Sequence, residues 1–326
     1  MNRMFKPAHR PHRRLLTVDT MAVNSSDGVL KLETGGRFGV KTTSQRLKAI
    51  FKRRDATIIP GAPNALFARV AEDLGYECIY VTGAGIANMH LGVPDIGLVT
   101  LSELADHVRA MTDAVTVPLL VDGDTGFGNP INTSRTMRMI ERAGAAGLQL
   151  EDQIFPKRCG HFSGKGVIPL DEMVQKIRAA VDARLDNNFQ IVARTDAIAV
   201  EGFAAALDRA HAFIEAGADV TFVEAPLDTE QMSRIASELP VPQIINVVHG
   251  GKTPPLSRPE FAQMGFAAAL YANAALQGAL LAVIEVLGSL RDHGSLHKMS
   301  DRLASFEDRQ QAVAKDKFDA LETRYR

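Results

Sequence analysis

The residues best suited to chemistry lie in one short stretch, residues 150–161, which ends in Lys-Arg-Cys-Gly-His. Cys159 is flanked there by Arg158 and His161, and cationic neighbours stabilise a thiolate. A thiol in such surroundings suits a nucleophile or a proton donor. The alternative interpretation is a solvated charged loop that happens to contain a cysteine, so the rest of the chain has to decide between the two.

Three carboxylates lie at the ends of apolar runs, or just after them, and these runs are expected to be buried strands. Asp122 and Asp124 stand two positions apart at the end of one run, and Glu151 ends the next. Hard carboxylate oxygens suit Mg²⁺, which keeps several waters and takes only one or two carboxylates directly. We expect Asp122 to bind Mg²⁺, or Mn²⁺ in its place, with Asp124 and Glu151 acting through water. The alternative is a glycine-rich turn with a capping aspartate. Asp95 is expected to support the same ion, unless it is an ordinary turn residue after Pro94.

Two further groups are suited to binding carboxylates. Arg194 ends another expected strand and can pair with a carboxylate through two hydrogen bonds, although Asp196 or Glu224 could be its structural partner instead. The turn after the second expected strand could present backbone N–H groups to a carboxylate or be a simple tight turn. This turn consists of Thr82, Gly83, Ala84 and Gly85.

These side chains need a scaffold that brings the ends of several strands together. Short β-branched or apolar runs alternate with segments that carry apolar residues every three to four positions. The expected strands are residues 56–60, 78–82, 118–122, 147–151, 190–195, 220–224, 243–246 and 267–271, and the expected helices include 64–74, 101–115, 132–143, 170–183, 203–216 and 229–239. Eight such units over about 240 residues predict a (β/α)8 TIM barrel, with a doubly wound sheet as the alternative. The active site of such a barrel lies at the C-terminal ends of its strands.

The two ends of the chain lie outside the predicted barrel domain, which we place at residues 44–293. Residues 1–43 are expected to form a flexible tail, because the beginning of the chain is basic and poor in acids, with an organelle transit peptide as the alternative. Residues 294–326 are expected to form a helical extension. After a helix over 274–291, a second helix over 301–325 would carry an apolar stripe that must pack on its own barrel or on a neighbouring subunit. The stripe consists of Leu303, Phe306, Val313, Phe318 and Leu321.

The composition argues against several classes of function. The net charge of the 326 residues is −1, so no charge excess favours nucleic acid or a membrane surface as the main partner. The longest apolar candidate, residues 266–287, contains Asn273, Gln277 and Glu285, and no membrane span is expected. The chain has 2 cysteines, too few for a disulfide framework, and Cys78 lies in an apolar run. A cytoplasmic protein is therefore expected.

Several motifs together give the chain a family resemblance. From about residue 44 to about residue 294 it resembles the isocitrate lyase and phosphoenolpyruvate mutase superfamily, especially the methylisocitrate lyase and dimethylmalate lyase branch. The resemblance implies a Mg²⁺-dependent barrel enzyme that acts on a small 2-hydroxy or 2-oxo acid. It also implies a homotetramer whose subunits exchange C-terminal helices. The motifs are Gly-Val-Pro-Asp at 92–95, Asp-Gly-Asp-Thr-Gly-Phe-Gly-Asn at 122–129, Glu-Asp-Gln at 151–153, Pro-Lys-Arg-Cys-Gly-His at 156–161, Ala-Arg-Thr-Asp at 193–196 and Gly-Gly-Lys-Thr-Pro at 250–254.

Within the superfamily, Lys-Arg-Cys-Gly-His is typical of lyases that break carbon–carbon bonds. The resemblance therefore implies cleavage of a 2-hydroxydicarboxylate to a 2-oxo acid such as pyruvate plus a carboxylate. A phosphonate-forming branch similar to carboxyphosphonoenolpyruvate mutase also keeps the cysteine, so a phosphonate mutase or hydrolase stays an alternative, as does an oxaloacetate hydrolase.

The same resemblance suggests a role for each site residue. Cys159 would supply a proton to the leaving carbanion, and the residues around it in the loop, Arg158, Gly160 and His161, would tune the thiol or contact substrate. Arg194 and the turn at 82–85 would hold carboxylates. Glu224 and Asn246 would orient the bond that breaks, and His249 and Gln277 would contact the remainder of the substrate.

Two positions depart from the pattern of the relatives. Gln277 stands where methylisocitrate lyases hold an arginine for a third carboxylate, and a neutral amide cannot form that charge-assisted pair, worth about 1.5–3 kcal/mol. A tricarboxylate substrate is therefore disfavoured, and a malate bearing alkyl groups fits better. His249 stands where relatives usually carry a glutamate, and the residue types alone do not explain what it would recognise.

Overall fold

The computed structural model describes residues 41–158 and 164–326. Eight parallel strands follow one another in the order β6-β5-β4-β3-β2-β1-β8-β7. A single parallel bridge between Thr221 of β6 and Gln243, next to β7, brings the two edges together. The strands are β1 (Thr57–Ala62), β2 (Ile79–Val81), β3 (Leu119–Asp122), β4 (Gly147–Glu151), β5 (Gln190–Thr195), β6 (Val220–Val223), β7 (Ile244–Asn246) and β8 (Ala268–Tyr271). The predicted (β/α)8 barrel is confirmed as a nearly closed one.

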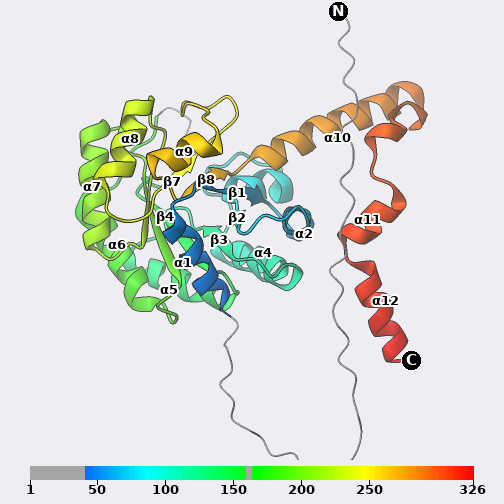
Figure 1. The fold of residues 1–326 in the computed structure, drawn as a ribbon, viewed down its shortest axis with the longest axis horizontal. Coiled ribbons are helices and arrows are strands. Elements are labelled where there is room, and N and C mark those ends of the chain that lie inside the picture. Colours follow the sequence, from blue (N-terminus) through cyan, green and yellow to red (C-terminus); the bar gives the residue numbers. More distant parts are fainter. Residues whose placement is uncertain (1–40, 159–163) are drawn as a thin grey trace, which may run out of the picture. The chain divides into compact units, whose positions relative to one another are not determined.

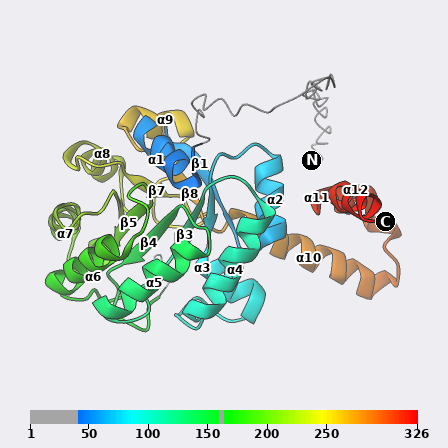
Figure 2. The ribbon, with the colours of Figure 1, turned by 90° about the horizontal axis from the view of Figure 1, so that it is seen from below.

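Helices surround this sheet, as Figures 1 and 2 show. The helices between consecutive strands turn apolar faces to the strands; in α4, for example, these residues are Leu104, Ala105, Val108 and Met111. The helices and helical turns are α1 (Thr43–Arg53), α2 (Ala65–Asp73), α3 (Gly83–Ile86), η1 (Ala87–Leu91), α4 (Leu101–Ala114), α5 (Pro130–Arg142), α6 (Leu170–Ala183), η2 (Ala197–Ala199), α7 (Phe203–Glu215), α8 (Thr229–Glu238), α9 (Arg258–Met264), α10 (Ala274–His293), η3 (His297–Arg302), α11 (Phe306–Ala312) and α12 (Lys315–Arg324).

The first helix was not predicted, because it precedes the first strand of the alternating pattern. α1 begins with a capping box between Thr42 and Gln45, and its apolar face enters the barrel core. Leu47 and Phe51 of α1 belong to the same buried cluster as Tyr80 and Leu120 of the strands. α1 therefore helps to fill the barrel interior and leaves the opposite rim for the site. The short helix α9 follows β7, where a helix was expected, but its bounds were not predicted.

The C-terminal extension differs from the prediction. A single helix over residues 301–325 is wrong, because this stretch contains the end of η3 and the two helices α11 and α12. Ser305 starts α11 with a capping box, and Ala314, between the two helices, has a left-handed backbone with φ of 52°. All five residues of the predicted stripe are exposed in the single chain, from 37% for Leu321 to 72% for Phe306.

α10 leaves the barrel after β8 and has no buried residue (Figure 1). Its exposed apolar residues include Leu280, Leu281, Ile284 and Leu287. Among the described helices it is the one long and apolar enough to cross a membrane by length and composition, which is weak support for a span. An exposed apolar surface of this kind is typical of a protein–protein contact, and the family resemblance implies exchange of the C-terminal helices between subunits.

Candidate functional site

A small cavity of about 40 Å³ lies among the C-terminal ends of the strands. It brings together residues from the ends of seven of the eight strands, all except β1, and from the connections after β2 and β4. Nine of its lining residues were predicted from sequence: Thr82, Ala84, Asp95, Asp122, Glu151, Arg158, Arg194, Glu224 and Asn246. Its other polar lining residues, Tyr80, Lys157 and Asn273, were not predicted. Cys159, Gly160 and His161, which we expected in the same site, lie outside the described residues.

An acidic cluster occupies one side of this cavity. Asp122 at the end of β3 accepts hydrogen bonds from the Gly83 N–H at 3.3 Å and from the Asp124 N–H at 3.3 Å. Asp124 has a left-handed backbone with φ of 46°, which holds its carboxylate next to that of Asp122. Gly83 belongs to α3, so the turn after β2 is a short helix whose first amide supports the acidic cluster.

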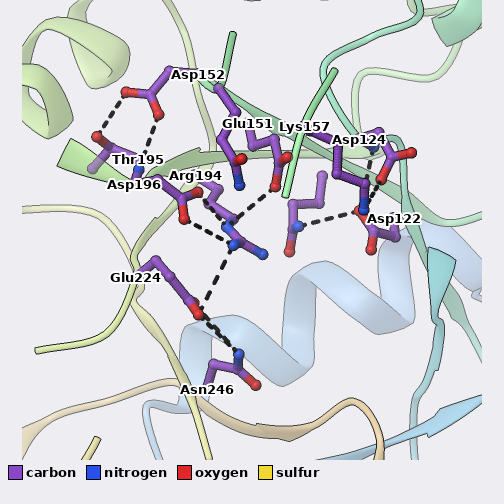
Figure 3. Close-up of polar contacts among 12 residues, drawn as sticks. Asp122, Asp124, Glu151, Asp152, Lys157, Arg194, Thr195, Asp196, Glu224 and Asn246 are labelled. Carbon is purple, nitrogen blue, oxygen red and sulfur yellow. Dashed lines mark hydrogen bonds and ion pairs between the residues drawn. The ribbon is translucent and has the colours of Figure 1, made fainter. Parts of the chain in front are cut away.

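Lys157 is buried within this acidic cluster. Its ammonium lies 2.8 Å from Asp124 Oδ1 and forms a second ion pair with Asp95, and its side chain is only 4% exposed (Figure 3). Burial on its own would lower the pKa of Lys157, but the charges of Asp124 and Glu151 outweigh this and raise it well above its ordinary value. Lys157 is therefore a permanent cation inside the site. Lys157 was not predicted as a site residue, although it lies in the stretch 150–161.

The acidic residues fit a hydrated divalent cation. Glu151 Oε1 is buried and accepts no hydrogen bond within the described part of the chain, whereas the buried Asp124 Oδ1 lies 2.8 Å from the Lys157 ammonium. Burial raises the pKa of Asp124 to about 6, with Lys157 opposing the shift, and burial raises that of Glu151 well above its ordinary value. In residues 41–158 and 164–326 no group of three or more acidic, His or Cys side chains is arranged to hold one ion directly. Mg²⁺ needs only one or two direct carboxylates, so these oxygens suit it.

Arg194 at the end of β5 occupies the centre of the other side (Figure 3). Its Nε and Nη2 donate to the two carboxylate oxygens of Asp196 at 2.9 and 3.1 Å. Glu151 lies 3.4 Å from Nε, and Glu224 lies 3.8 Å from Nη2. The guanidinium also lies over the Phe222 ring, 5.1 Å from its centroid. Arg194 is thus fixed in direction and 8% exposed at the cavity wall.

Asp196, the partner of Arg194, is itself held in place by a neighbouring carboxylate, Asp152. Asp152 accepts hydrogen bonds from the Thr195 hydroxyl at 2.7 Å and from the Asp196 N–H at 2.9 Å. Burial and the charge of Asp196 raise the pKa of Asp152 to about 6. Arg209 of α7 lies 3.4 Å from Asp152 and also binds Glu201. This buried network extends from the site to the outer helices.

Glu224 and Asn246 complete the rim where β6 and β7 end. The Asn246 side-chain amide lies 3.4 Å from both oxygens of Glu224 and donates to them. Both residues are buried, and Asn246 Oδ1 has no hydrogen bond in the described residues. An amide oxygen left in this way can accept a hydrogen bond from a ligand.

His249 and Gln277 lie apart from this cavity. They line a neighbouring pocket of about 410 Å³, which shares Val248 and Asn273 with the cavity at the strand ends. Tyr271 is part of its wall, and none of the described side chains lining it is a lysine or an arginine. The structure thus places these two residues next to the cavity at the strand ends and not within it.

Comparison with known sequences adds to this geometry. Residues 47–291 match the family model described as phosphoenolpyruvate phosphomutase. A 2,3-dimethylmalate lyase from Eubacterium barkeri is 38% identical over 283 residues, which are 87% of this chain and 98% of the relative. A 2-methylisocitrate lyase from Aeropyrum pernix is 42% identical over 257 residues, 79% of this chain and 82% of the relative. Both relatives are carbon–carbon lyases.

Solved structures agree with these sequences. A crystal structure of 2,3-dimethylmalate lyase has a TM-score of 0.83 and 32% identity, and covers 88% of this chain and 96% of its own. Oxaloacetate acetylhydrolase with 3,3-difluorooxalacetate has a TM-score of 0.81 and 35% identity, and covers 86% and 96%. Phosphonopyruvate hydrolase, solved with oxalate and Mg²⁺, has a TM-score of 0.79 and 29% identity, and covers 87% and 99%.

Proposed function

The chain belongs to the phosphoenolpyruvate mutase/isocitrate lyase superfamily, and we propose that it is a Mg²⁺-dependent carbon–carbon lyase. Its substrate would be a 2-hydroxydicarboxylate of the alkylmalate or methylisocitrate type, cleaved to a 2-oxo acid such as pyruvate and a second carboxylate. The observation that carries the proposal is the cavity where Arg194, Glu224 and Asn246 face Asp122 and Glu151. Relatives that are carbon–carbon lyases support it.

Asp122 would hold the metal directly, with Asp95, Asp124 and Glu151 acting through water. Mg²⁺, or Mn²⁺ in its place, would supply positive charge that stabilises the negative charge developing on the substrate oxygens. The buried Glu151 Oε1, which accepts no hydrogen bond within the described residues, supports this assignment.

The substrate carboxylate would pair with Arg194, because a fixed guanidinium binds a carboxylate through parallel charge-assisted hydrogen bonds. Cleavage turns the hydroxyl-bearing carbon into a carbonyl as the hydroxyl proton is lost. The electron pair of the broken bond stays on the leaving carbon, which then takes a proton. Cys159 would donate that proton, with Arg158 and His161 tuning the thiol and Gly160 next to it, as the sequence motif suggests.

The turn at Thr82–Gly85 and the Glu224–Asn246 pair would complete substrate binding. Ala84 and Thr82 line the cavity, whereas the Gly83 and Gly85 amides donate to Asp122 and to the Thr82 hydroxyl. We therefore assign carboxylate contact to the Thr82 and Ala84 part of the turn.

The pocket beside the cavity suggests the kind of substrate. Its walls include Val247, Val248 and Tyr271, and its polar side chains include His249 and Gln277. An apolar substituent is stabilised by such walls, whereas a third carboxylate would be buried without a lysine or arginine beside it. An alkyl-substituted malate therefore fits better than a tricarboxylate.

For the assembly, we propose a homotetramer in which α10 to α12 cover a neighbouring subunit. Exposed apolar residues along these helices, such as Leu281, Leu287 and Phe306, support a protein cover. We keep residues 44–293 as the catalytic barrel, 294–326 as the helical extension and 1–43 as a tail. A cytoplasmic location without a nucleic-acid or membrane partner fits the near-neutral charge and the buried free thiol of Cys78.

The test is to incubate the purified protein and Mg²⁺ with a panel of alkylmalates, 2-methylisocitrate, oxaloacetate and phosphonopyruvate. Release of a 2-oxo acid from an alkylmalate, abolished by EDTA, is expected. Oxaloacetate hydrolysis is the second candidate, because oxaloacetate acetylhydrolase is a neighbour at 35% identity. Phosphate release from phosphonopyruvate without lyase activity, or silence across the panel, would contradict the proposal.

A further inference from the structure

Lys165 forms a buried ion pair behind the substrate-binding arginine. Its ammonium lies 2.6 Å from Asp196 Oδ1, and the side chains are 1% and 0% exposed. Lys165 lies on the connection between β4 and α6, which is held to the barrel by a hydrogen bond from the Ile168 N–H to the Asp152 carbonyl at 2.8 Å. A lysine side chain is rarely buried this far unless it serves a charge partner.

The charges around Arg194 explain why a second cation is needed. Asp196, Glu151 and Glu224 all lie within 3.8 Å of the guanidinium, so three carboxylates surround one positive charge. A guanidinium in that setting would be more than neutralised and would attract an anionic ligand weakly. An additional cation paired with one of these carboxylates offsets part of the negative charge around Arg194.

Lys165 pairs with Asp196, the carboxylate that makes the shortest contacts with Arg194. Asp196 Oδ1 is shared between Lys165 Nζ at 2.6 Å and Arg194 Nη2 at 3.1 Å. Burial on its own would raise the pKa of Asp196, but Arg194 and Lys165 outweigh it and lower the pKa to about 2. Asp196 therefore stays ionised and keeps both cations.

We propose that Lys165 is a positioning residue for substrate binding: by offsetting the charge of Asp196, it leaves Arg194 oriented by that carboxylate yet still attractive to a substrate carboxylate. This inference rests on the proposed role of Arg194. Lys165 itself touches Asp196 and not the substrate, so it acts on affinity for the anion through its neighbour.

Arg209 provides a matched control in the same network. It is also a buried cation, 6% exposed, but it lies beside Asp152, one carboxylate further from Arg194. Replacing either cation by methionine removes one buried charge and leaves its carboxylate with one ion-pair partner fewer, which destabilises the fold in both cases. The difference between the two variants therefore isolates the effect on Arg194.

The experiment measures oxalate binding to the full chain by calorimetry in saturating Mg²⁺, with Mn²⁺ affinity and Tm recorded for each variant. Lys165→Met should weaken oxalate on the order of tenfold, the size expected for loss of a nearby buried charge. Arg209→Met should lower Tm comparably and leave oxalate affinity within about twofold. Mn²⁺ affinity should stay within about threefold in both, because neither cation lies in the acidic cluster. Equal oxalate affinities for the two variants would overturn the inference.

One further variant separates this inference from the proposed function. Arg194→Met should abolish measurable oxalate binding; normal binding in that variant, or none in the wild type, would overturn the role of Arg194 and this inference with it. If Arg194→Met fails to bind and Lys165→Met binds normally, only the inference about Lys165 is wrong.

A double-mutant cycle tests the route through Asp196. In an Asp196→Asn background the carboxylate that Lys165 offsets is gone, so Lys165→Met should change oxalate affinity by less than about twofold. A full tenfold effect that persists in that background would show that Lys165 acts independently of Asp196 and would contradict the inference.

Discussion

The ammonium of Lys157 lies 2.8 Å from Asp124 Oδ1, inside the cluster of carboxylates where we expect the divalent cation. A fixed positive charge is therefore present in the metal site before any metal binds. It lowers the cluster's attraction for a second cation and opposes the rise in the pKa of Asp124 and Glu151 that burial causes.

Replacing Lys157 should consequently tighten metal binding. We expect Lys157→Met to raise Mn²⁺ affinity on the order of tenfold, measured by electron paramagnetic resonance, because one repelling charge is removed. Lys52→Met, on the exposed side of α1, is the matched control and should leave affinity unchanged. Asp122→Asn should abolish binding. Weaker Mn²⁺ binding in Lys157→Met would contradict this account of Lys157.

The role of Cys159 can be tested without reference to its position. Cys159→Ser should keep Mg²⁺ and oxalate binding within about threefold and lose at least about 10²-fold in kcat, the usual size of a general acid's contribution. Calorimetry and steady-state kinetics on the same preparation give both values. Near-normal turnover would remove the thiol from the mechanism.

Gln277 should govern the choice between substrates. Gln277→Arg adds a cation to the pocket beside the cavity, and we expect kcat/KM for 2-methylisocitrate to rise about tenfold relative to an alkylmalate. Gln277→Met, which adds no charge, is the control and should leave the ratio near that of the wild type. An unchanged ratio in the arginine variant would show that this pocket does not receive the third carboxylate.

The raised pKa of Asp152 predicts a dependence of stability on pH. Its pKa is about 6 in the folded protein against an ordinary 3.8. The folded state therefore holds this proton more tightly, and the contribution of Asp152 to stability falls as pH rises from about 4 to about 6. Asparagine does not titrate, so the variant Asp152→Asn lacks this effect. The difference in unfolding free energy between the wild type and Asp152→Asn should therefore fall by up to about 3 kcal/mol across that range. Urea unfolding at pH 4.5 and pH 7 measures it, and a constant difference would refute it.

Periodicity and strand-end chemistry were enough to predict the barrel and the neighbourhood of most polar residues. The bounds of β4 and β5 match the prediction because both are apolar runs ended by a charged residue, Glu151 and an Arg194-Thr195 pair. Lys165 could not be found in this way, because its partner Asp196 is 31 residues away and only the fold brings them together. The break at Ala314 was missed because it depends on backbone conformation in a stretch without glycine or proline.

The sparse pairing between β6 and β7 has a consequence for local opening of the barrel. One bridge, at Thr221 and Gln243, closes the wall there, whereas β4 and β5 are paired along five residues. Glu224 and Asn246 stand at the ends of β6 and β7 and are hydrogen-bonded to each other. A substrate that contacts both residues would stabilise the barrel where its strands are least paired. Amide hydrogen exchange in β6 and β7 should therefore slow on ligand binding, while the exchange rates in β4 and β5 stay unchanged. Ligand binding and local opening of the barrel between β6 and β7 would then be coupled, and hydrogen exchange in these two strands would report both.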